Sequence, residues 1–137
     1  MENLDTIIFI AIVIAAIPLA LYLFPVAIWF SALLSGVRIS MIDLTFMRLR
    51  RSPVAQIIRA LIIAAKGGII IDRFELEAHA LAGGNVTKVV YGMVAAKKAG
   101  LELSFQKASA SDFKGIDLVK AVHKEIETRK EKEIIFE

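Results

Sequence analysis

The pattern of hydrophobic positions divides the chain into one uniformly apolar run and a longer amphipathic part. Between Asp5 and Arg38 the sequence contains no aspartate, glutamate, lysine or arginine. A helix needs about 20 consecutive apolar residues to span a bilayer core, and the rest of so short a chain is too small to bury such a helix on every side. Residues 6–37 therefore predict a membrane segment. The acidic N-terminus and the length of the run argue against a cleaved signal peptide.

The path of this segment through the membrane has two possible forms. As one helix, residues 6–37 would reach roughly 48 Å, beyond a hydrocarbon core of ~30 Å, so a break is expected at Pro18 or Pro25. Either residues 6–24 span once and a second apolar helix lies in the interface, or the segment is a re-entrant hairpin that bends near Pro25. The hairpin would carry Arg38 towards lipid, which is costly, so the single span is favoured.

The remaining pattern predicts several short elements. Residues 41–51 alternate apolar side chains with arginines and predict an interfacial segment, with a strand as the alternative. Apolar stripes at helical spacing predict helices over 53–66, 72–82, 85–99 and from 117 onward, with Ser52, Asp72, Asn85 and Asp117 as N-terminal caps. Ser109 and Asp112 are further candidate helix starts. Residues 101–106 alternate with a period of two and predict a half-buried strand, and residues 134–137 resemble the start of another.

These elements define the expected fold class and organisation. We expect a mostly α membrane protein, with an N-terminal hydrophobic helix or re-entrant hairpin followed by a small α-rich α+β cytoplasmic region. The expected divisions are a membrane anchor at 1–37, a basic interfacial segment at 38–52, and a small helical region with one or two short strands at 53–137.

Charge is concentrated immediately after the apolar run. Between residues 38 and 66 the only acidic residue is Asp43, against six basic ones. This bias places the C-terminal region in the cytoplasm and favours contact with anionic lipids, at about 1 kcal/mol per basic residue near the surface. The rival interpretation, a nucleic-acid surface, would need a basic face with interleaved aromatic residues. The residues expected at the membrane interface are Tyr22, Trp29, Arg38, Arg48, Arg50, Arg51 and Arg59.

Composition excludes several kinds of chemistry. The 137 residues include no cysteine and carry a formal net charge of +3, so disulfides and thiolate sites are excluded. The two histidines, His79 and His123, are far apart and lack ligand-like spacing. The turn at residues 83–85 lacks the spacing of a phosphate-binding loop. With no nucleophile beside a base and no paired carboxylates, we expect neither a catalytic site nor a cofactor.

Four stretches resemble a known family. They are FPVAIWFSALLSGVRIS (24–40), MRLRRSP (47–53), LEAHALAGGNVTKVV (76–90) and AAKKAGLELSFQKASASDFKGIDLVKAV (95–122). In the same order, they are similar to the N-terminal region of the bacterial flotillin-like protein A family. The resemblance implies a cell-membrane scaffold that self-associates, gathers in lipid microdomains and influences membrane fluidity and the clustering of other membrane proteins, without enzymatic activity or cofactor.

The resemblance stops before the end of the family pattern. In that family the membrane segment precedes a prohibitin-like domain and a long Glu/Ala-rich helical region that drives assembly. The present sequence ends at Glu137, and residues 123–137 do not continue the pattern, so it is either truncated or a short relative. We expect a flotillin-like scaffold that binds the bilayer and anionic lipids and forms homo-oligomers. The alternative is a small regulatory membrane subunit that binds one larger protein through residues 53–100.

Overall fold

The computed structural model describes residues 2–135, and within this range the chain forms helices and no strand. The mostly helical prediction is confirmed, and the α+β prediction is wrong. The helices, in chain order, are α1 (Glu2–Leu23), α2 (Val26–Leu34), α3 (Met41–Leu49), α4 (Val54–Lys66), α5 (Arg73–Leu81), α6 (Val86–Lys98), α7 (Phe105–Phe113) and α8 (Leu118–Ile135).

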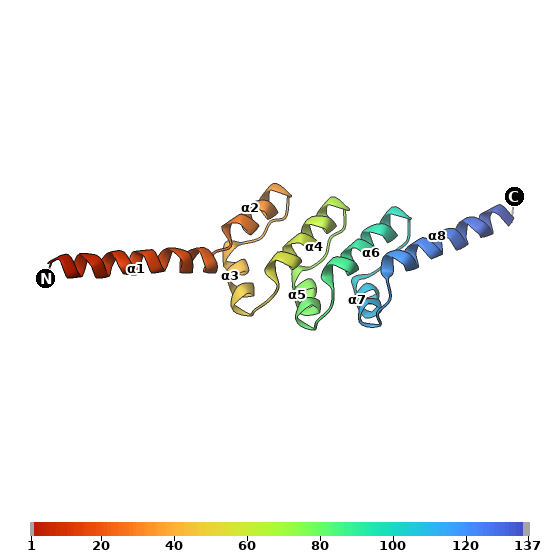
Figure 1. The fold of residues 1–137 in the computed structure, drawn as a ribbon. Coiled ribbons are helices and arrows are strands. Elements are labelled where there is room, and N and C mark those ends of the chain that lie inside the picture. Colours follow the sequence, from red (N-terminus) through yellow and green to blue (C-terminus); the bar gives the residue numbers. More distant parts are fainter. Residues whose placement is uncertain (1, 136–137) are drawn as a thin grey trace.

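After α1, the helices form a stack of helical hairpins (Figure 1). Helices α2, α4, α6 and α8 follow one another along the stack, and α3, α5 and α7 lie below them in this view. The hairpins are α2 with α3, α4 with α5, and α6 with α7, and α8 packs against α6. Turns that follow α2, α4 and α6 lie at the upper edge, and turns that follow α3, α5 and α7 lie at the lower edge. Helix α1 projects away from the stack at one end.

The stack is built from a repeat of 32 residues, which the sequence analysis missed. In each hairpin, the turn after the first helix (α2, α4 or α6) contains a glycine with positive φ. The turns after the second helices α5 and α7 also contain such a glycine, whereas the turn after α3 has Arg51 at this position. These left-handed positions are Gly36, Gly68 and Gly100 at the upper edge and Arg51, Gly83 and Gly115 at the lower edge. A Schellman bond from the N–H of the next residue to the carbonyl five positions earlier closes all six turns.

Buried positions recur with the same period. Small residues occupy one position in the first helices, and larger apolar residues occupy others. The recurring buried sets are Ala32, Ala64 and Ala96; Val54, Val86 and Leu118; Ile58, Val90 and Val122; and Leu44, Leu76 and Ala108. The buried residues form two clusters, and the partly buried Ile69, Ile71 and Phe105 pack against both. Each hairpin therefore contributes an equivalent layer to a linked core, as in helical solenoids, where a repeat buries its apolar face only against its neighbours.

The predicted strand at residues 101–106 is a linker followed by the start of α7. Residues 101–104 have no regular structure, and the Ser104 side chain accepts a bond from the N–H of Lys107 at the start of α7. Leu101 and Leu103 are half-buried whereas Glu102 is exposed. The alternation is real, but it arises because an extended linker points every second side chain at the core. Residues 37–39 and 69–71 repeat this arrangement.

Local signals gave most of the helix starts. Asp72 and Asn85 cap α5 and α6 by accepting bonds from the N–H groups of Phe74 and Lys88, and Asp117 accepts from the N–H of Lys120 at the start of α8. The predicted cap at Ser52 is wrong, because α4 begins after Pro53 without a side-chain cap. Ser109 and Asp112 lie within α7 rather than before a helix.

Of the second predicted strand, residues 134 and 135 belong to α8, and residues 136–137 lie outside the described range.

Candidate membrane interface

Helix α1 is apolar around its whole circumference. The segment Asn3–Leu34 is long and apolar enough to cross a membrane, and none of its most apolar window is buried inside the protein. The 22 residues of α1 correspond to about 33 Å of helix, close to the ~30 Å of a hydrocarbon core. Pro18 lies inside α1 without ending it, and the break comes at Phe24 and Pro25.

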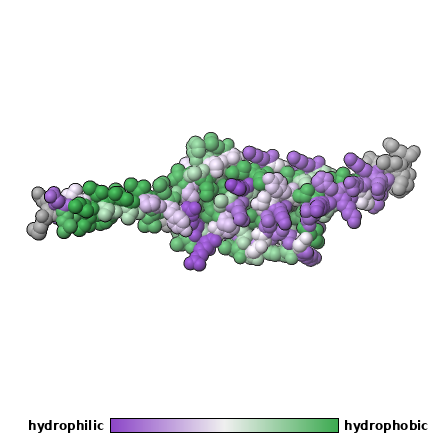
Figure 2. Space-filling view, in the orientation of Figure 1, coloured by the Kyte–Doolittle hydropathy of each residue, from purple (hydrophilic) through white to green (hydrophobic). Residues whose placement is uncertain are grey.

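The apolar surface continues from α1 onto α2. Val26, Phe30, Leu33 and Leu34 are all exposed, Leu34 by 73%. Figure 2 shows hydrophobic side chains covering α1 and reaching the adjoining end of the stack, whereas hydrophilic ones gather over the opposite end. A groove of about 570 Å³ lies where α1 meets α2, and its lining is apolar except for Arg48. Exposed apolar surface of this extent marks an interaction site.

Arg48 joins the end of α1 to α3. Its guanidinium lies 4.9 Å from the centre of the Tyr22 ring, and its Nη1 donates to the Tyr22 carbonyl oxygen. The last carbonyls of a helix have no partner within that helix, and a cation there is favourable. Arg48 therefore binds the C-terminal end of the apolar helix α1, where its guanidinium can extend to the depth of the lipid headgroups. These two predicted interface residues are the pair that the structure brings together.

Arg50 is held by the stack instead. Its Nε and Nη2 donate to the two carboxylate oxygens of Glu77 at 3.0 and 2.9 Å. Ser52 donates its hydroxyl to the same carboxylate at 2.5 Å. The Glu77 side chain is 6% exposed, against 51% for Arg50. This bidentate ion pair links the first hairpin to the second, because Arg50 follows α3 and Glu77 lies on α5.

The other predicted interface residues are dispersed. Trp29 is half-buried against the core, and its indole N–H donates to the Ile39 carbonyl at 3.1 Å. Arg38 and Arg51 are exposed at opposite ends of α3, and Arg59 is exposed on α4. Whether these residues meet lipid stays a prediction.

Sequence reasoning missed the exposed apolar residues of α2 and α3. Phe30 and Leu34 on α2 and Ile42, Phe46 and Leu49 on α3 are each at least half exposed. Their spacing of three and four positions is a helical stripe, which by itself predicts burial. In α3 the sequence signal for exposure is a second apolar stripe, Leu44 and Met47, which is buried. Since one stripe already faces the core, the other stripe, Ile42, Phe46 and Leu49, is exposed.

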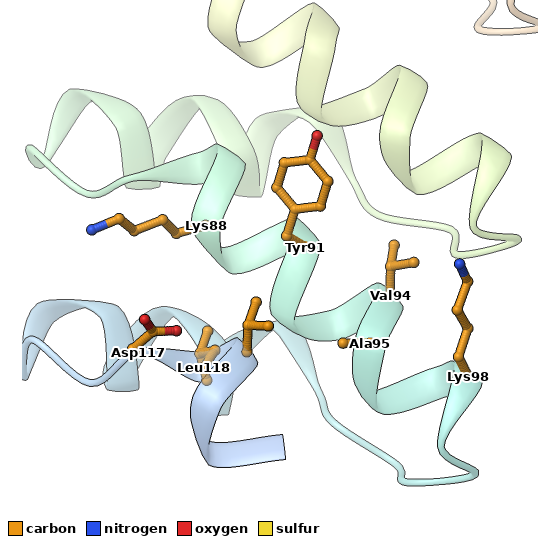
Figure 3. Close-up of a pocket in the computed structure, with 8 residues that line it drawn as sticks. Lys88, Tyr91, Val94, Ala95, Lys98, Asp117 and Leu118 are labelled. Atoms are coloured by element: carbon orange, nitrogen blue, oxygen red, sulfur yellow. The ribbon is translucent and has the colours of Figure 1, made fainter. Parts of the chain in front are cut away.

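Two further features lie away from this interface. Figure 3 shows a groove of about 440 Å³ between α6 and α8, with Tyr91, Val94 and Leu118 along it and Lys88 and Lys98 at its rim. Its carboxylate, Asp117, is the cap of α8. His79 is 4% exposed, and its Nε2 lies 2.9 Å from Oδ2 of Asp112. That oxygen also accepts the Asn85 N–H, so this pair ties α5 to α7.

The fold and the apolar helix together define a class of protein, an α-helical repeat protein with a candidate membrane-spanning helix near its N-terminus. The profile of the family "Flotillin-like protein FloA" matches residues 6–132. The chain belongs to this family, as the resemblance implied.

Relatives named flotillin-like protein FloA come from distant bacteria. The protein of Oceanobacillus iheyensis is 50% identical over 124 residues, which are 89% of this chain and 38% of the relative. That of Desulfosudis oleivorans is 40% identical over 71% of this chain and 30% of its own length, and that of Staphylococcus aureus strain JH9 is 37% identical over 89% and 37%. The chain thus spans less than two fifths of these relatives. No solved structure matches it.

Proposed function

We propose that the chain is a non-enzymatic, flotillin-like membrane scaffold. Helix α1 anchors it in the bacterial cell membrane, and the stack of hairpins stands on the cytoplasmic side and offers surfaces for self-association and for other membrane proteins. The observation that carries this proposal is that none of the most apolar window of α1 is buried inside the protein, and its large apolar side chains are exposed. Water is an unfavourable solvent for such a surface, and a bilayer is a favourable one.

The packing of α2 and α3 supports the single span over the re-entrant hairpin. The hairpin would need its second limb to run through lipid to about Met47. In the structure Ala32 of α2 and Leu44 and Met47 of α3 are fully buried in the core of the stack. A limb that builds the core of the soluble part is a poor second crossing, so α2 lies at the interface and α1 alone enters the bilayer.

Substitutions in α1 test the anchor. Lysine at the centre of a membrane helix costs about 2.5–3.5 kcal/mol per residue, so the double variant Ile10→Lys/Ile14→Lys should move the chain from the carbonate-resistant membrane fraction to the soluble fraction. Both isoleucines are exposed on α1. The matched control is Ile70→Lys, since Ile70 is fully exposed on a linker of the stack, and it should stay with the membrane. Equal behaviour of the two variants would refute the anchor.

A tag on Met1 separates the two topologies. The single span places the tag outside the cell, where an impermeant reagent labels it in intact cells. Labelling only after lysis would instead support the re-entrant hairpin.

Cross-linking in native membranes separates the scaffold from its alternative. A ladder of homotypic products supports self-association, whereas one stable heteromeric band supports a small regulatory subunit bound to a larger protein. The alternative rests on the extended surface that helical repeats present to partners.

A further inference from the structure

The lower edge of the stack carries a row of exposed apolar residues at one repeat position. Leu49, Leu81 and Phe113 are the last residues of α3, α5 and α7, each 32 positions from the next. They are 74%, 52% and 57% exposed. A single exposed leucine needs no explanation, but an apolar residue at the same exposed position in three successive repeats forms a continuous row along the edge. We define these three residues as the lower row.

The opposite edge has the contrary chemistry. Lys66 and Lys98 end α4 and α6, and Lys130 occupies the same repeat position in α8. All three are exposed lysines. We define them as the upper row. The two rows lie at opposite ends of the hairpins, because the first helices end at the upper edge and the second helices end at the lower edge (Figure 1). In α2 the same repeat position is Leu34, which is exposed and apolar. Beyond its first hairpin the stack is therefore amphipathic, as an interfacial helix is on a smaller scale.

We propose that the lower row lies on the lipid bilayer, so that the stack lies along the membrane surface rather than standing away from it. This inference rests on the proposed function, since α1 brings the stack to the membrane. Charge beside the row fits an anionic surface, because Arg51 lies two residues after Leu49 and Lys114 follows Phe113, and both are exposed. Arg50, between Leu49 and Arg51, is paired with Glu77 instead. At the equivalent residues of the three lower turns, 49–53, 81–85 and 113–117, the only acidic residue is Asp117. Each basic residue near anionic lipid contributes about 1 kcal/mol.

The exposed faces of α3, α5 and α7 are also apolar, and their apolar character decreases along the stack. At the repeat position of Ile42 the next hairpins carry Phe74 and Gln106, and at that of Phe46 they carry Ala78 and Ala110. All six side chains are exposed. Apolar character is thus greatest beside α1 and falls with distance from it. This gradient is expected of a surface continuous with the membrane anchor.

A second copy of the chain fits the row less well. A stable protein interface buries about 800 Å² on each partner, and three partly exposed side chains in single file supply far less. Binding to a bilayer does not require one large contiguous interface, because each apolar side chain can enter the interfacial region of the membrane separately. The arrangement requires α1 to turn relative to the stack at Phe24 and Pro25, where the helix is already interrupted. Such a turn breaks the contact of Arg48 with Tyr22 that the structure shows.

The test uses single-cysteine variants of the whole chain, which contains no native cysteine. Leu49→Cys, Leu81→Cys and Phe113→Cys are each labelled with the fluorophore NBD, and Lys66→Cys, Lys98→Cys and Lys130→Cys are the matched controls from the upper row. Each is reconstituted into vesicles of phosphatidylcholine and phosphatidylglycerol with and without lipids that carry a nitroxide near the headgroup. Circular dichroism checks that every labelled variant keeps its helix content.

We expect a blue-shifted emission and quenching by the nitroxide lipid at all three positions of the lower row, and neither effect at the upper row. Quenching at Leu49→Cys alone would overturn the inference, because position 49 is near the anchor. A blue shift at positions 81 and 113 without quenching would also overturn it and would indicate a protein partner. Flotation of the same vesicles reports the anchor independently: chains that float with an unquenched lower row refute only this inference, and chains that do not float refute the anchor as well.

Discussion

Arg51 adopts the left-handed backbone conformation, and glycine occupies the two equivalent positions of the repeat. Its φ is 60°, and Gly83 and Gly115 at the same repeat position have φ of 87° and 72°. A left-handed conformation costs a residue with a Cβ roughly 1–2 kcal/mol, and glycine avoids this cost. The first lower turn is therefore strained where the other two are not.

This strain predicts opposite effects for two substitutions. Arg51→Gly should raise the free energy of unfolding by up to about 1 kcal/mol, and Gly83→Ala should lower it by about 1 kcal/mol. A Cβ on Gly83 would meet nothing within 4 Å, so its loss comes from the backbone alone. Urea unfolding of the detergent-solubilised chain, followed by circular dichroism, measures both.

Gly83→Asn is the control for this comparison, because asparagine tolerates the left-handed region better than alanine does. It should lose less stability than Gly83→Ala. If Arg51→Gly and Gly83→Ala shift the unfolding midpoint in the same direction, the turn geometry is not as described.

Polar side chains also pair across neighbouring hairpins. Glu77 is a buried carboxylate that accepts bonds from Arg50 and Ser52, and the His79 and Asp112 pair joins the next two hairpins. Such pairs add little net stability compared with apolar packing, but an unpaired buried charge is strongly unfavourable. They therefore favour this register of the stack over alternatives that would separate the partners.

At the scale of the element, α6 and α8 approach each other closely at Gly92. A Cβ built on Gly92 of α6 would lie 2.4 Å from Cβ of Leu118 on α8, a distance that real Cβ atoms do not reach. Ala60 occupies the same repeat position on α4. The glycine at 92 lets α8 sit tightly against the last complete hairpin.

Gly92→Ala should therefore loosen α8. The alanine raises the helix propensity of α6 by about 1 kcal/mol, yet the clash should lower stability by about 1–3 kcal/mol. We expect faster hydrogen exchange in the α8 amides and faster proteolysis after Lys120 and Lys124, with little change in α4.

Thr87→Ala is the control on α6, because it raises helix propensity while removing side-chain atoms rather than adding them. It should leave exchange in α8 unchanged. Slower exchange in α8 of Gly92→Ala than in the unsubstituted chain would contradict the close approach.

Individual elements differ in how far the sequence predicted them. Asp72 and Asn85 were recognised as caps because capping depends on one side chain and its own turn. Residues 101–106 were misread as a strand, since alternation shows which side chains face the core and not whether the backbone pairs with a neighbour. Arg50 was assigned to lipid because its partner, Glu77, lies 27 positions away and is brought close only by the stack.

The repeat itself was missed for a different reason. Equivalent positions of the repeat share a backbone conformation or a side-chain size more often than the same amino acid. For example, Ser40, Asp72 and Ser104 cap α3, α5 and α7, but only two of the three are serine. The glycines at 36, 68 and 100 were the available signal, since a fixed spacing of turn residues indicates a helical array.

At the scale of the whole molecule, two kinds of surface coexist in one chain. The stack buries a core of its own, whereas no described side chain of α1 belongs to that core, and α1 projects from its end (Figure 1). Stability of the stack therefore depends on packing between successive hairpins, and the stability of α1 depends on its solvent. The central claim is that this solvent is lipid.

Hydrogen exchange along the whole chain, measured in lipid nanodiscs and again after lipid removal in detergent-free buffer, tests that claim most directly. With lipid present, we expect the α1 amides to be among the slowest to exchange and the buried helices of the stack to be protected as well. Without lipid, the chain should aggregate through α1. A monomer that stays soluble without lipid, with α1 protected to the same extent as in nanodiscs, would contradict the claim.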